Sequence, residues 1–313
     1  MPNWVQNEIA IKGKSADLVK FINDGLKGSF KYCRNKLQIT ELNQETIDQI
    51  NNLSGKRRLS FASYVPMPKT FIKWDTTNQK CKFDDWIERG KSTNFGNYDK
   101  ELFQKIRAYF EENKEKWVAI AKEKYADIVK WDSEYERYAE HLAAADMFPN
   151  EYEEYLKVYS EPYDNAVAEQ KQKYGVVGWY DWRRKNYGTK WDADFDNITL
   201  VHLLDDYAIL YVSMETAWSM PLSWLNTMLQ RYDNLRFVLY ATEESDAFGG
   251  FYDIKGDYCE DIDFDSIYNK YKGKEDETEE EEQQRYNDIC DEVNGEKSRV
   301  YDNFVKYMES VEI

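Results

Sequence analysis

A strand–helix–strand pattern in the second half of the sequence most limits what this chain can fold into. The segment Tyr207–Met214 is strongly apolar, as buried strands are. Leu222–Tyr232 places its apolar residues on one face of a helix, and Leu235–Thr242 alternates as a strand does. Two apolar strands joined by an amphipathic helix share one core, so this part of the chain predicts a sheet with helices packed on it.

The first 70 residues repeat the pattern in a weaker form. Residues 4–12 alternate imperfectly between apolar and polar side chains, which favours a strand. Ser15 is a suitable N-cap for the helix that follows. Leu59–Val65 predicts a second strand, which Pro66 and Pro68 end. We therefore expect an α+β fold in which the N-terminal strand joins a split βαβ sheet built mainly from residues 207–252.

A helical region separates these two parts of the sequence. From Phe103 to Leu142, aromatic and apolar residues recur at spacings of three and four, which predicts a long amphipathic helix with a break near Asn113. Pro149 ends this helix, and Pro162 can open a further one at its first turn. Residues 99–175 are therefore expected to form a helical insertion.

The C-terminal segment is the most acidic part of the chain. Residues 257–313 contain 19 acidic and 7 basic residues, a net charge of −12 out of −17 for the whole protein. The acidic run Glu275–Glu282 predicts a solvated loop or a frayed helix end. The expected organisation is a discontinuous core of residues 1–98 and 176–256, the insertion at 99–175, and an acidic helical tail at 257–313.

Charge and composition argue against several classes of partner. A net charge of −17 repels free duplex DNA and anionic membranes. The longest strongly apolar run is far shorter than the roughly 20 residues of a membrane helix, and the first residues do not have the pattern of a secretory signal. The four cysteines form no CxxC pair, so we expect neither a zinc site nor a disulfide framework. These features are typical of a soluble protein of a reducing cytoplasm.

Four segments of the sequence form an ordered set of motifs. They are Met1–Trp4 with Asn7 and the strand to Gly13; Val65–Pro68; Trp179–Trp182 with Asn186 and Gly188–Ala193; and Thr216–Ser219 with Pro221 and the bend at Phe248–Gly250. Together they resemble the YubB-like (Api-like) family of phage and conjugative-plasmid proteins. The resemblance covers residues 1–70 and 176–256, about half the chain, and the segments occur in the family's order.

The resemblance implies a ferredoxin-like domain carried on a mobile element, and hence a bacterial host cytoplasm. It implies no reaction, because the family has none assigned. The sequence departs from the family pattern at three positions: Val5 stands where Cys is expected, Tyr187 where Trp is usual, and Met220 where a second Pro is common.

The tryptophan-rich segment around Gly188–Ala193 is the candidate ligand pocket. Aromatic walls with a few convergent polar groups are typical of small-molecule sites, although the same tryptophans could simply pack the sheet against its helices. The candidate pocket residues are Trp179, Trp182, Arg183, Lys190, Trp191, Asp192 and Trp218.

Catalytic and metal-binding patterns are weak in this sequence. The run Asp192–Asp196 has acids at alternate positions, but Asn197 replaces the central Gly and Leu203 the closing Glu of a calcium loop. His141 and His202 accompany no nucleophile motif, and Gly249 and Gly250 do not fit a phosphate-binding loop. We therefore predict no catalytic residues, no metal and no cofactor, and we favour a binding protein over an enzyme.

The acidic segments suggest the leading hypothesis about function. Carboxylates on a rigid surface can imitate a phosphate backbone, and neighbouring aromatic residues can anchor a protein partner. We therefore expect an accessory protein that binds a host or defence protein, for example as a counter-defence inhibitor. The alternatives are a small-molecule or nucleotide pocket, which could belong to an enzyme, and a virion or structural role. The candidate partner-binding residues are Glu151, Glu153, Glu154, Tyr155, Glu277, Glu279, Glu280, Glu281 and Glu282.

Overall fold

The computed structural model divides the chain into two compact units. One unit combines Met1–Pro68 with Tyr180–Ile313, and the other comprises Lys69–Trp179. The residues that the structure describes are 3–29, 37–53, 58–74, 83, 86, 100–126, 132–256, 258–273 and 277–312.

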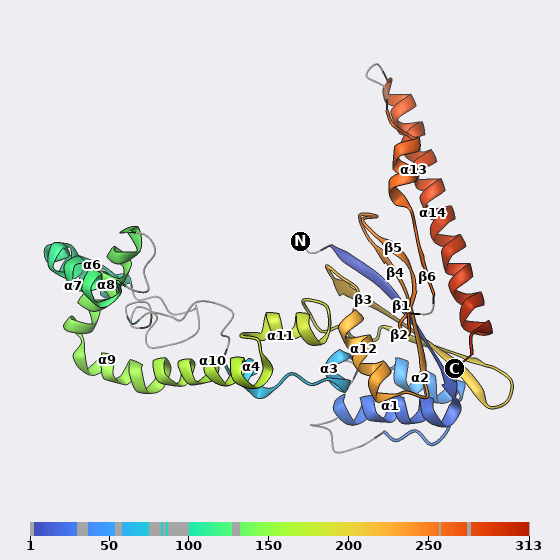
Figure 1. The fold of residues 1–313 in the computed structure, drawn as a ribbon, viewed down its shortest axis with the longest axis horizontal. Helices are drawn as coiled ribbons and strands as arrows, with labels where there is room; N and C mark the ends of the chain where they lie inside the picture. Colours follow the sequence, from blue (N-terminus) through green and yellow to red (C-terminus); the bar gives the residue numbers. More distant parts are fainter. Residues whose placement is uncertain are drawn as a thin grey trace. The chain divides into compact units, whose positions relative to one another are not determined.

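The first unit is built on a mixed α+β arrangement with one six-stranded antiparallel sheet (Figure 1). The strand order is β2-β3-β1-β4-β5-β6, so the N-terminal strand lies between two strands that follow it by about 200 residues. The strands are β1 (Trp4–Lys14), β2 (Asn197–His202), β3 (Tyr207–Ala217), β4 (Arg236–Glu243), β5 (Gly249–Asp253) and β6 (Cys259–Asp261). The predicted strands at 4–12, 207–214 and 235–242 are confirmed as β1, β3 and β4.

One face of the sheet is covered by α1 (Ser15–Ser29) and α12 (Leu222–Arg231). Alternate residues of β1 point to this face, including the fully buried Val5 and Ile9. Phe21 of α1 packs edge-on against Phe237 of β4, with 6.0 Å between ring centroids. The amphipathic patterns seen in the sequence therefore correspond to one shared core.

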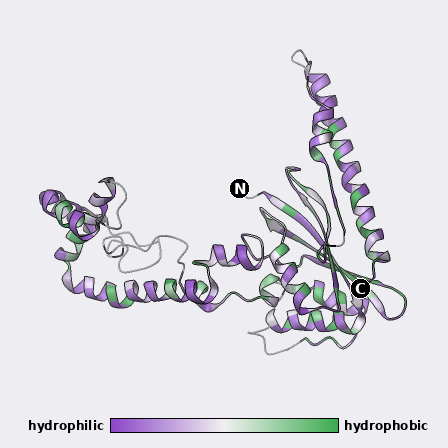
Figure 2. Cartoon of the chain, viewed as in Figure 1, coloured by the Kyte–Doolittle hydropathy of each residue, from purple (hydrophilic) through white to green (hydrophobic). Residues whose placement is uncertain are grey.

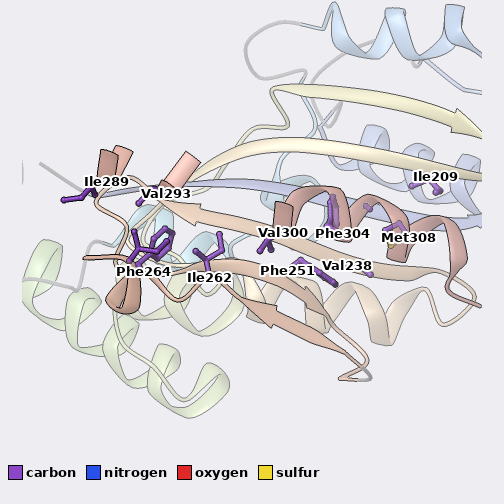
Figure 3. Packing of buried hydrophobic residues seen from close by; sticks show 12 residues of the cluster. Ile209, Val238, Phe251, Ile262, Phe264, Ile289, Val293, Val300, Phe304 and Met308 are labelled. Carbon is purple, nitrogen blue, oxygen red and sulfur yellow. The ribbon is translucent and has the colours of Figure 1, made fainter. Parts of the chain in front are cut away.

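The opposite face is covered by α14 (Glu279–Ser310), which packs across β1, β4 and β5 (Figure 3). Phe304 and Met308 are completely buried against this face. Phe251 of β5 lies 6.2 Å from Phe304, centroid to centroid. α14 thus supplies most of the helical side of the apolar layer on this face of the sheet. α13 (Phe264–Lys270) adds Phe264 and Ile267 to the same cluster.

The remaining elements of this unit are short helices. α2 (Gln44–Asn51) starts at the N-cap Asn43, whose side chain accepts the Thr46 N–H. α3 (Phe61–Tyr64) replaces the strand predicted at Leu59–Val65, and that prediction is wrong. Ser60 and Ser63 form a capping box that starts a helical turn there, so only a single β-bridge from Ser60 remains.

The free edge of β2 is shielded by a side chain that the sequence did not single out. The Asn51 amide of α2 donates to Ile198 O and its carbonyl oxygen accepts from Ile198 N, each at 2.8 Å. Asn51 therefore occupies hydrogen-bonding positions that a further strand would otherwise use.

We expect Asn51→Ala to lower the free energy of unfolding by about 1–2 kcal/mol, because both backbone groups of Ile198 lose their partners. The variant should also self-associate more readily at high concentration, since part of the β2 edge is opened. Chemical denaturation and light scattering measure the two effects. Gln49→Ala, an exposed change on the same helix, is the control; equal stability of the two variants would contradict the edge role.

The second unit is helical, with α4 (Lys69–Lys73), α6 (Lys100–Glu112), α7 (Lys114–Lys124), α8 (Asp132–Met147), α9 (Pro149–Tyr155), the π-helical turn η2 (Leu156–Ser160) and α10 (Glu161–Tyr174). The predicted break near Asn113 is confirmed, because Asn113 is the N-cap of α7. Tyr155, Tyr159 and Tyr163 form a ladder of rings spaced 5.7 and 5.8 Å apart within this unit's core.

The units divide the chain differently from the sequence-based domains. Residues 99–175 belong to the helical unit, whereas the acidic segment 257–313 belongs to the unit of the sheet. Within the described part of the chain, no helix combines the length and apolarity needed to span a membrane.

Candidate functional site

Segments that the sequence singled out lie close together in the sheet unit. The buried Asn7 amide of β1 donates to Thr216 Oγ1 of β3 at 2.9 Å. Thr216 donates in turn to Ser219 O at 2.8 Å, and Ser219 donates to Gly188 O at 2.6 Å. This chain of hydrogen bonds joins three segments that are far apart in the sequence.

The loop at Gly188 fits closely against the start of α12. Gly188 has a φ of +84°, and a Cβ at this position would lie 3.1 Å from the backbone nitrogen of Leu222. The preceding Tyr187 is buried and donates its hydroxyl to Val65 O at 2.8 Å, which brings in the Val65–Pro68 segment. Burial raises the pKa of Tyr187, so it remains a donor at neutral pH.

An aromatic surface cluster lies beside this hydrogen-bond chain, and we define it as Trp4, Lys190, Trp191 and Trp218. The rings of Trp4 and Trp191 are 5.7 Å apart. Lys190 Nζ lies 5.0 Å from the Trp191 centroid and 6.0 Å from that of Trp218. Trp218 is 54% exposed, so the cluster is open to solvent.

The other predicted pocket residues lie elsewhere. Trp182 of α11 (Trp179–Asn186) is 4% exposed and packs edge-on against Tyr187 at 5.3 Å. Trp179 belongs to the helical unit. Arg183 is half-buried and affects the pKa values of Tyr187 and Asp192 through its charge. Trp4 was missed as a candidate, although it lies in one of the four segments that the sequence singled out.

Asp192 holds α3 in place. Its carboxylate accepts the Ala62 N–H at 3.0 Å and the Ser60 hydroxyl at 3.2 Å. The flanking backbone adds a bond from Phe61 N to Ala193 O and one from Phe195 N to Leu59 O. Burial raises the pKa of Asp192, and the two hydrogen bonds and Arg183 oppose this shift.

We expect Asp192→Ala to lower the free energy of unfolding by about 1–2 kcal/mol, because the Ala62 N–H loses its cap. Asp192→Asn keeps an acceptor and should cost less. Because the folded-state pKa is raised, the folded protein binds the proton more tightly, and wild-type stability falls as pH rises from about 4 through that pKa. Denaturation of wild type and Asp192→Asn between pH 4 and 7 should show the variant's free energy of unfolding rising relative to that of wild type as the pH increases. Parallel pH profiles of the two proteins would contradict this.

The acidic run after Asp192 does not converge on a metal position. Asp196 forms an ion pair with Arg58 at 3.6 Å, and Asp194 forms the β-bridge with Ser60. Among the described residues, no group of three or more His, Cys, Asp or Glu side chains is placed to hold a metal ion. His202 is exposed, and His141 accepts the Phe83 N–H through Nδ1 at 2.9 Å.

Two cavities in the described part of the sheet unit lie away from the aromatic cluster. One, of about 440 Å³, is lined by residues that include Ser15, Leu42 and His202. The other, of about 510 Å³, includes Lys12 and Leu204. None of the candidate pocket residues lines either cavity.

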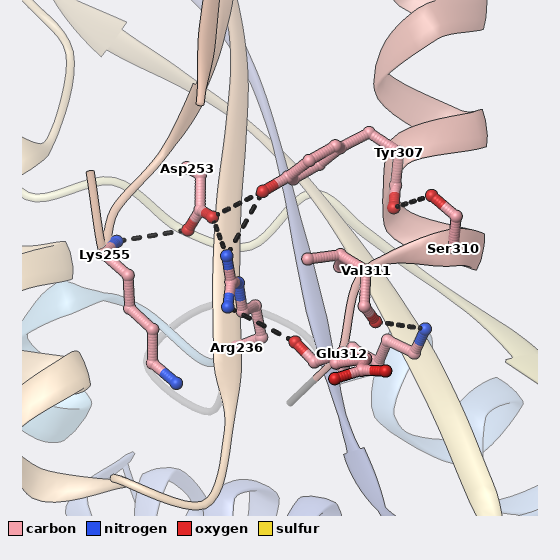
Figure 4. A network of polar contacts seen from close by, with 8 residues as sticks. Arg236, Asp253, Lys255, Tyr307, Ser310, Val311 and Glu312 are labelled. Atoms are coloured by element: carbon pink, nitrogen blue, oxygen red, sulfur yellow. Dashed lines mark hydrogen bonds and ion pairs between the residues drawn. The ribbon is translucent and has the colours of Figure 1, made fainter. Parts of the chain in front are cut away.

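A buried polar network fastens the end of α14 to the sheet (Figure 4). Arg236 of β4 forms an ion pair with Asp253 of β5, and Tyr307 of α14 donates to the same carboxylate at 2.7 Å. Lys12 of β1 donates to three carbonyl oxygens at the C-terminal end of α14, those of Met308, Glu309 and Val311, each at 2.9 Å. Burial lowers the pKa of Lys12, and the charge of Glu309 partly opposes the shift.

The predicted acidic residues of the tail lie at the start of α14, where the helix extends beyond the strands (Figure 1). Glu279, Glu280 and Glu282 are exposed in the first turn. Glu277 is paired with Arg285 at 2.9 Å, and Glu281 accepts the Thr278 N–H in a capping box. The projecting end of the helix is mainly hydrophilic (Figure 2).

The candidates of the helical unit divide between surface and core. Glu153 and Glu154 are exposed on α9, and Glu151 is partly exposed. Tyr155 is only 3% exposed and packs against Phe83 at 5.5 Å. Tyr155 therefore belongs to the core of this unit and offers no surface to a partner.

Comparison with known proteins adds a loose structural likeness. No family model matches the chain, and no curated protein matches it. Among solved structures, the crystal structure of protein Api92 from Yersinia pseudotuberculosis, of family DUF1281, is similar with a TM-score of 0.29 and 11% sequence identity. The likeness covers 84% of this chain and 98% of that one.

Proposed function

We propose that this chain is a non-enzymatic accessory protein of a phage or other mobile element. In this proposal it binds a host or defence protein in the bacterial cytoplasm through an acidic, aromatic surface. The partner carries a basic groove of the kind that receives nucleic acid, and the carboxylates of this protein occupy that groove.

The observation that carries the proposal is the projecting end of α14. Three exposed glutamates, Glu279, Glu280 and Glu282, share this end with Tyr286, which is 61% exposed. We name these four residues the acidic tip. An exposed tyrosine beside carboxylates combines a hot-spot side chain with charge that guides association.

Helix stability alone explains only part of this arrangement. Glutamates in the first turn of a helix stabilise it by about 0.3–1 kcal/mol each through the helix dipole. The same account gives no reason for an exposed aromatic ring two turns into the helix. The exposure of Tyr286 therefore favours a binding surface over an arrangement that only stabilises the end of the helix.

We also propose a ferredoxin-like core for the sheet unit. The support is the order β2-β3-β1-β4, with α1 following β1 and α12 joining β3 to β4. This is the arrangement of a split βαβ unit, to which β5, β6 and α14 are additions.

Affinity capture from a bacterial host lysate tests the proposed partner. Glu279→Gln, Glu280→Gln and Glu282→Gln together with Tyr286→Ala should weaken salt-sensitive capture of a specific protein by about tenfold or more. Glu277 and Glu281 are left unchanged because they hold local structure. Glu153→Gln with Glu154→Gln on the helical unit is the matched control for acidic surface in general. Undiminished capture by the tip variant would overturn the proposal for the tip.

A further inference from the structure

We propose that the aromatic cluster is a binding site for the cationic side chain of a protein, an arginine or a lysine. In the free protein, the ammonium group of the chain's own Lys190 occupies this site. The inference rests on the proposed function in taking the partner to be a protein, but it does not depend on the acidic tip.

The geometry of Lys190 identifies the chemistry that the indole rings accept. Its ammonium group lies over Trp191 at 5.0 Å and within 6.0 Å of Trp218. A cation within about 6 Å of an indole centroid is attracted by the electron-rich face of the ring. An ammonium group thus already lies within cation–π distance of both rings. A partner's guanidinium can take the same position, because planar guanidinium groups stack well on aromatic rings.

The backbone holds Trp218 on the surface in an unfavourable conformation. Its φ is +76°, in the left-handed region that bulky residues rarely adopt. The Trp218 N–H donates to Asn3 O at 2.9 Å, and the bond from Thr216 to Ser219 O closes the same turn. Backbone strain at an exposed tryptophan is characteristic of sites where a side chain must be presented in one orientation.

The surrounding charge favours a cation. Glu215 lies opposite Gln6 in the sheet, on the same face as Trp4 and diagonal to it, and its side chain is exposed. The Gln6 amide donates to the Glu215 carboxylate at 2.5 Å, so the acid is held in position. With a net charge of −17, the whole protein also attracts basic partners.

The binding of a fluorescein-labelled hexa-arginine peptide, followed by anisotropy, tests the site without a change in protein charge. Trp218→Ala should weaken binding about five- to tenfold, and Trp218→Phe should retain most of it. Leu204→Ala removes an apolar side chain that is 86% exposed in the β2–β3 turn and should leave affinity unchanged. Equal affinity of wild type and Trp218→Ala would overturn the proposal.

Trp218→Gly guards against misfolding of the alanine variant. Glycine adopts a φ of +76° without strain, so this variant should be at least as stable as Trp218→Ala while also lacking the indole. It should therefore show the same loss of peptide binding. A stable Trp218→Gly protein with wild-type affinity would overturn the proposal even if Trp218→Ala were unfolded.

Lys190→Ala determines the sign of the ligand's charge. If Lys190 competes with the ligand, its removal should tighten hexa-arginine binding about twofold or more beyond the effect of Lys306→Ala, an exposed change of equal charge on α14. If Lys190 instead binds a phosphate, its removal should weaken binding of labelled oligothymidylate, and that result would replace the cationic ligand with a nucleotide. In the background of the acidic-tip variant, Trp218→Ala should weaken peptide binding by the same factor as in wild type. The two proposals can therefore fail independently of each other.

Discussion

A chain that ends at Gly256 is expected to lose the cooperative unfolding of its sheet unit. The deletion removes β6, α13 and α14, and the loss of the two helices uncovers the apolar face formed in part by Ala10, Val238 and Phe251. Burying one large apolar side chain contributes about 1.5–3 kcal/mol. Loss of the buried apolar residues of α14 therefore removes a contribution comparable with the roughly 5–15 kcal/mol by which domains are ordinarily stable. Thermal unfolding followed by circular dichroism, together with dye binding to exposed apolar surface, measures the effect.

Two point variants on α14 test separately the buried and the exposed parts of the helix. Phe304→Ala should cost about 3–5 kcal/mol, because the ring is completely buried against Tyr240 and Phe251. Tyr286→Ala, on the exposed part of the same helix, should change stability by less than about 0.5 kcal/mol. If the truncated chain melted cooperatively near the wild-type temperature, α14 would be an appendage and not part of the core. Loss of a binding partner in such a truncation would therefore report unfolding, so the tip variant is the sharper test of function.

Asp253→Asn should lower the free energy of unfolding by about 3–5 kcal/mol. The change leaves the Arg236 guanidinium buried beside a neutral amide, and removing one member of a buried ion pair has an effect of that size. The side chain of Asp253 is fully buried and that of Arg236 is 9% exposed, so water cannot replace the lost charge. Urea denaturation at neutral pH measures the difference.

The control for this prediction is a more exposed ion pair on α14. Glu296→Gln breaks the pair with Arg299, whose side chain is half exposed and keeps a second carboxylate partner in Glu260. The expected cost is below about 0.5–1 kcal/mol. Similar losses of stability for Asp253→Asn and Glu296→Gln would show that burial of the network in Figure 4 does not raise the cost of removing one charge.

The tryptophan-rich segment shows how far sequence reasoning reached into the candidate site. Its composition marked Lys190, Trp191 and Trp218, and the structure brings these three together. The same composition gave no means to separate them from Trp182, which is buried in the core. Exposure depends on which neighbours cover a ring, and those neighbours come from distant segments.

The acidic residues show the same limit. Glu277 and Glu279 are alike in the sequence, yet one is paired with Arg285 and the other is exposed at a helix start. Tyr155 follows a run of exposed glutamates but lies inside the helical unit. Charge density therefore predicted an acidic surface, while the tertiary structure decided which of its residues a partner could reach.

Elements whose patterns repeat over many residues can be predicted from the sequence. The alternation in β1 and β4 and the apolar face of α12 are local, because each strand or helix must turn its apolar residues to one side. The covering of the second sheet face, the single helical turn at α3 and the shielding of β2 by Asn51 are instead set by long-range packing. These depend on contacts such as that between Lys12 and Met308, 296 residues apart, whose formation is set by packing and by the need to satisfy buried polar groups.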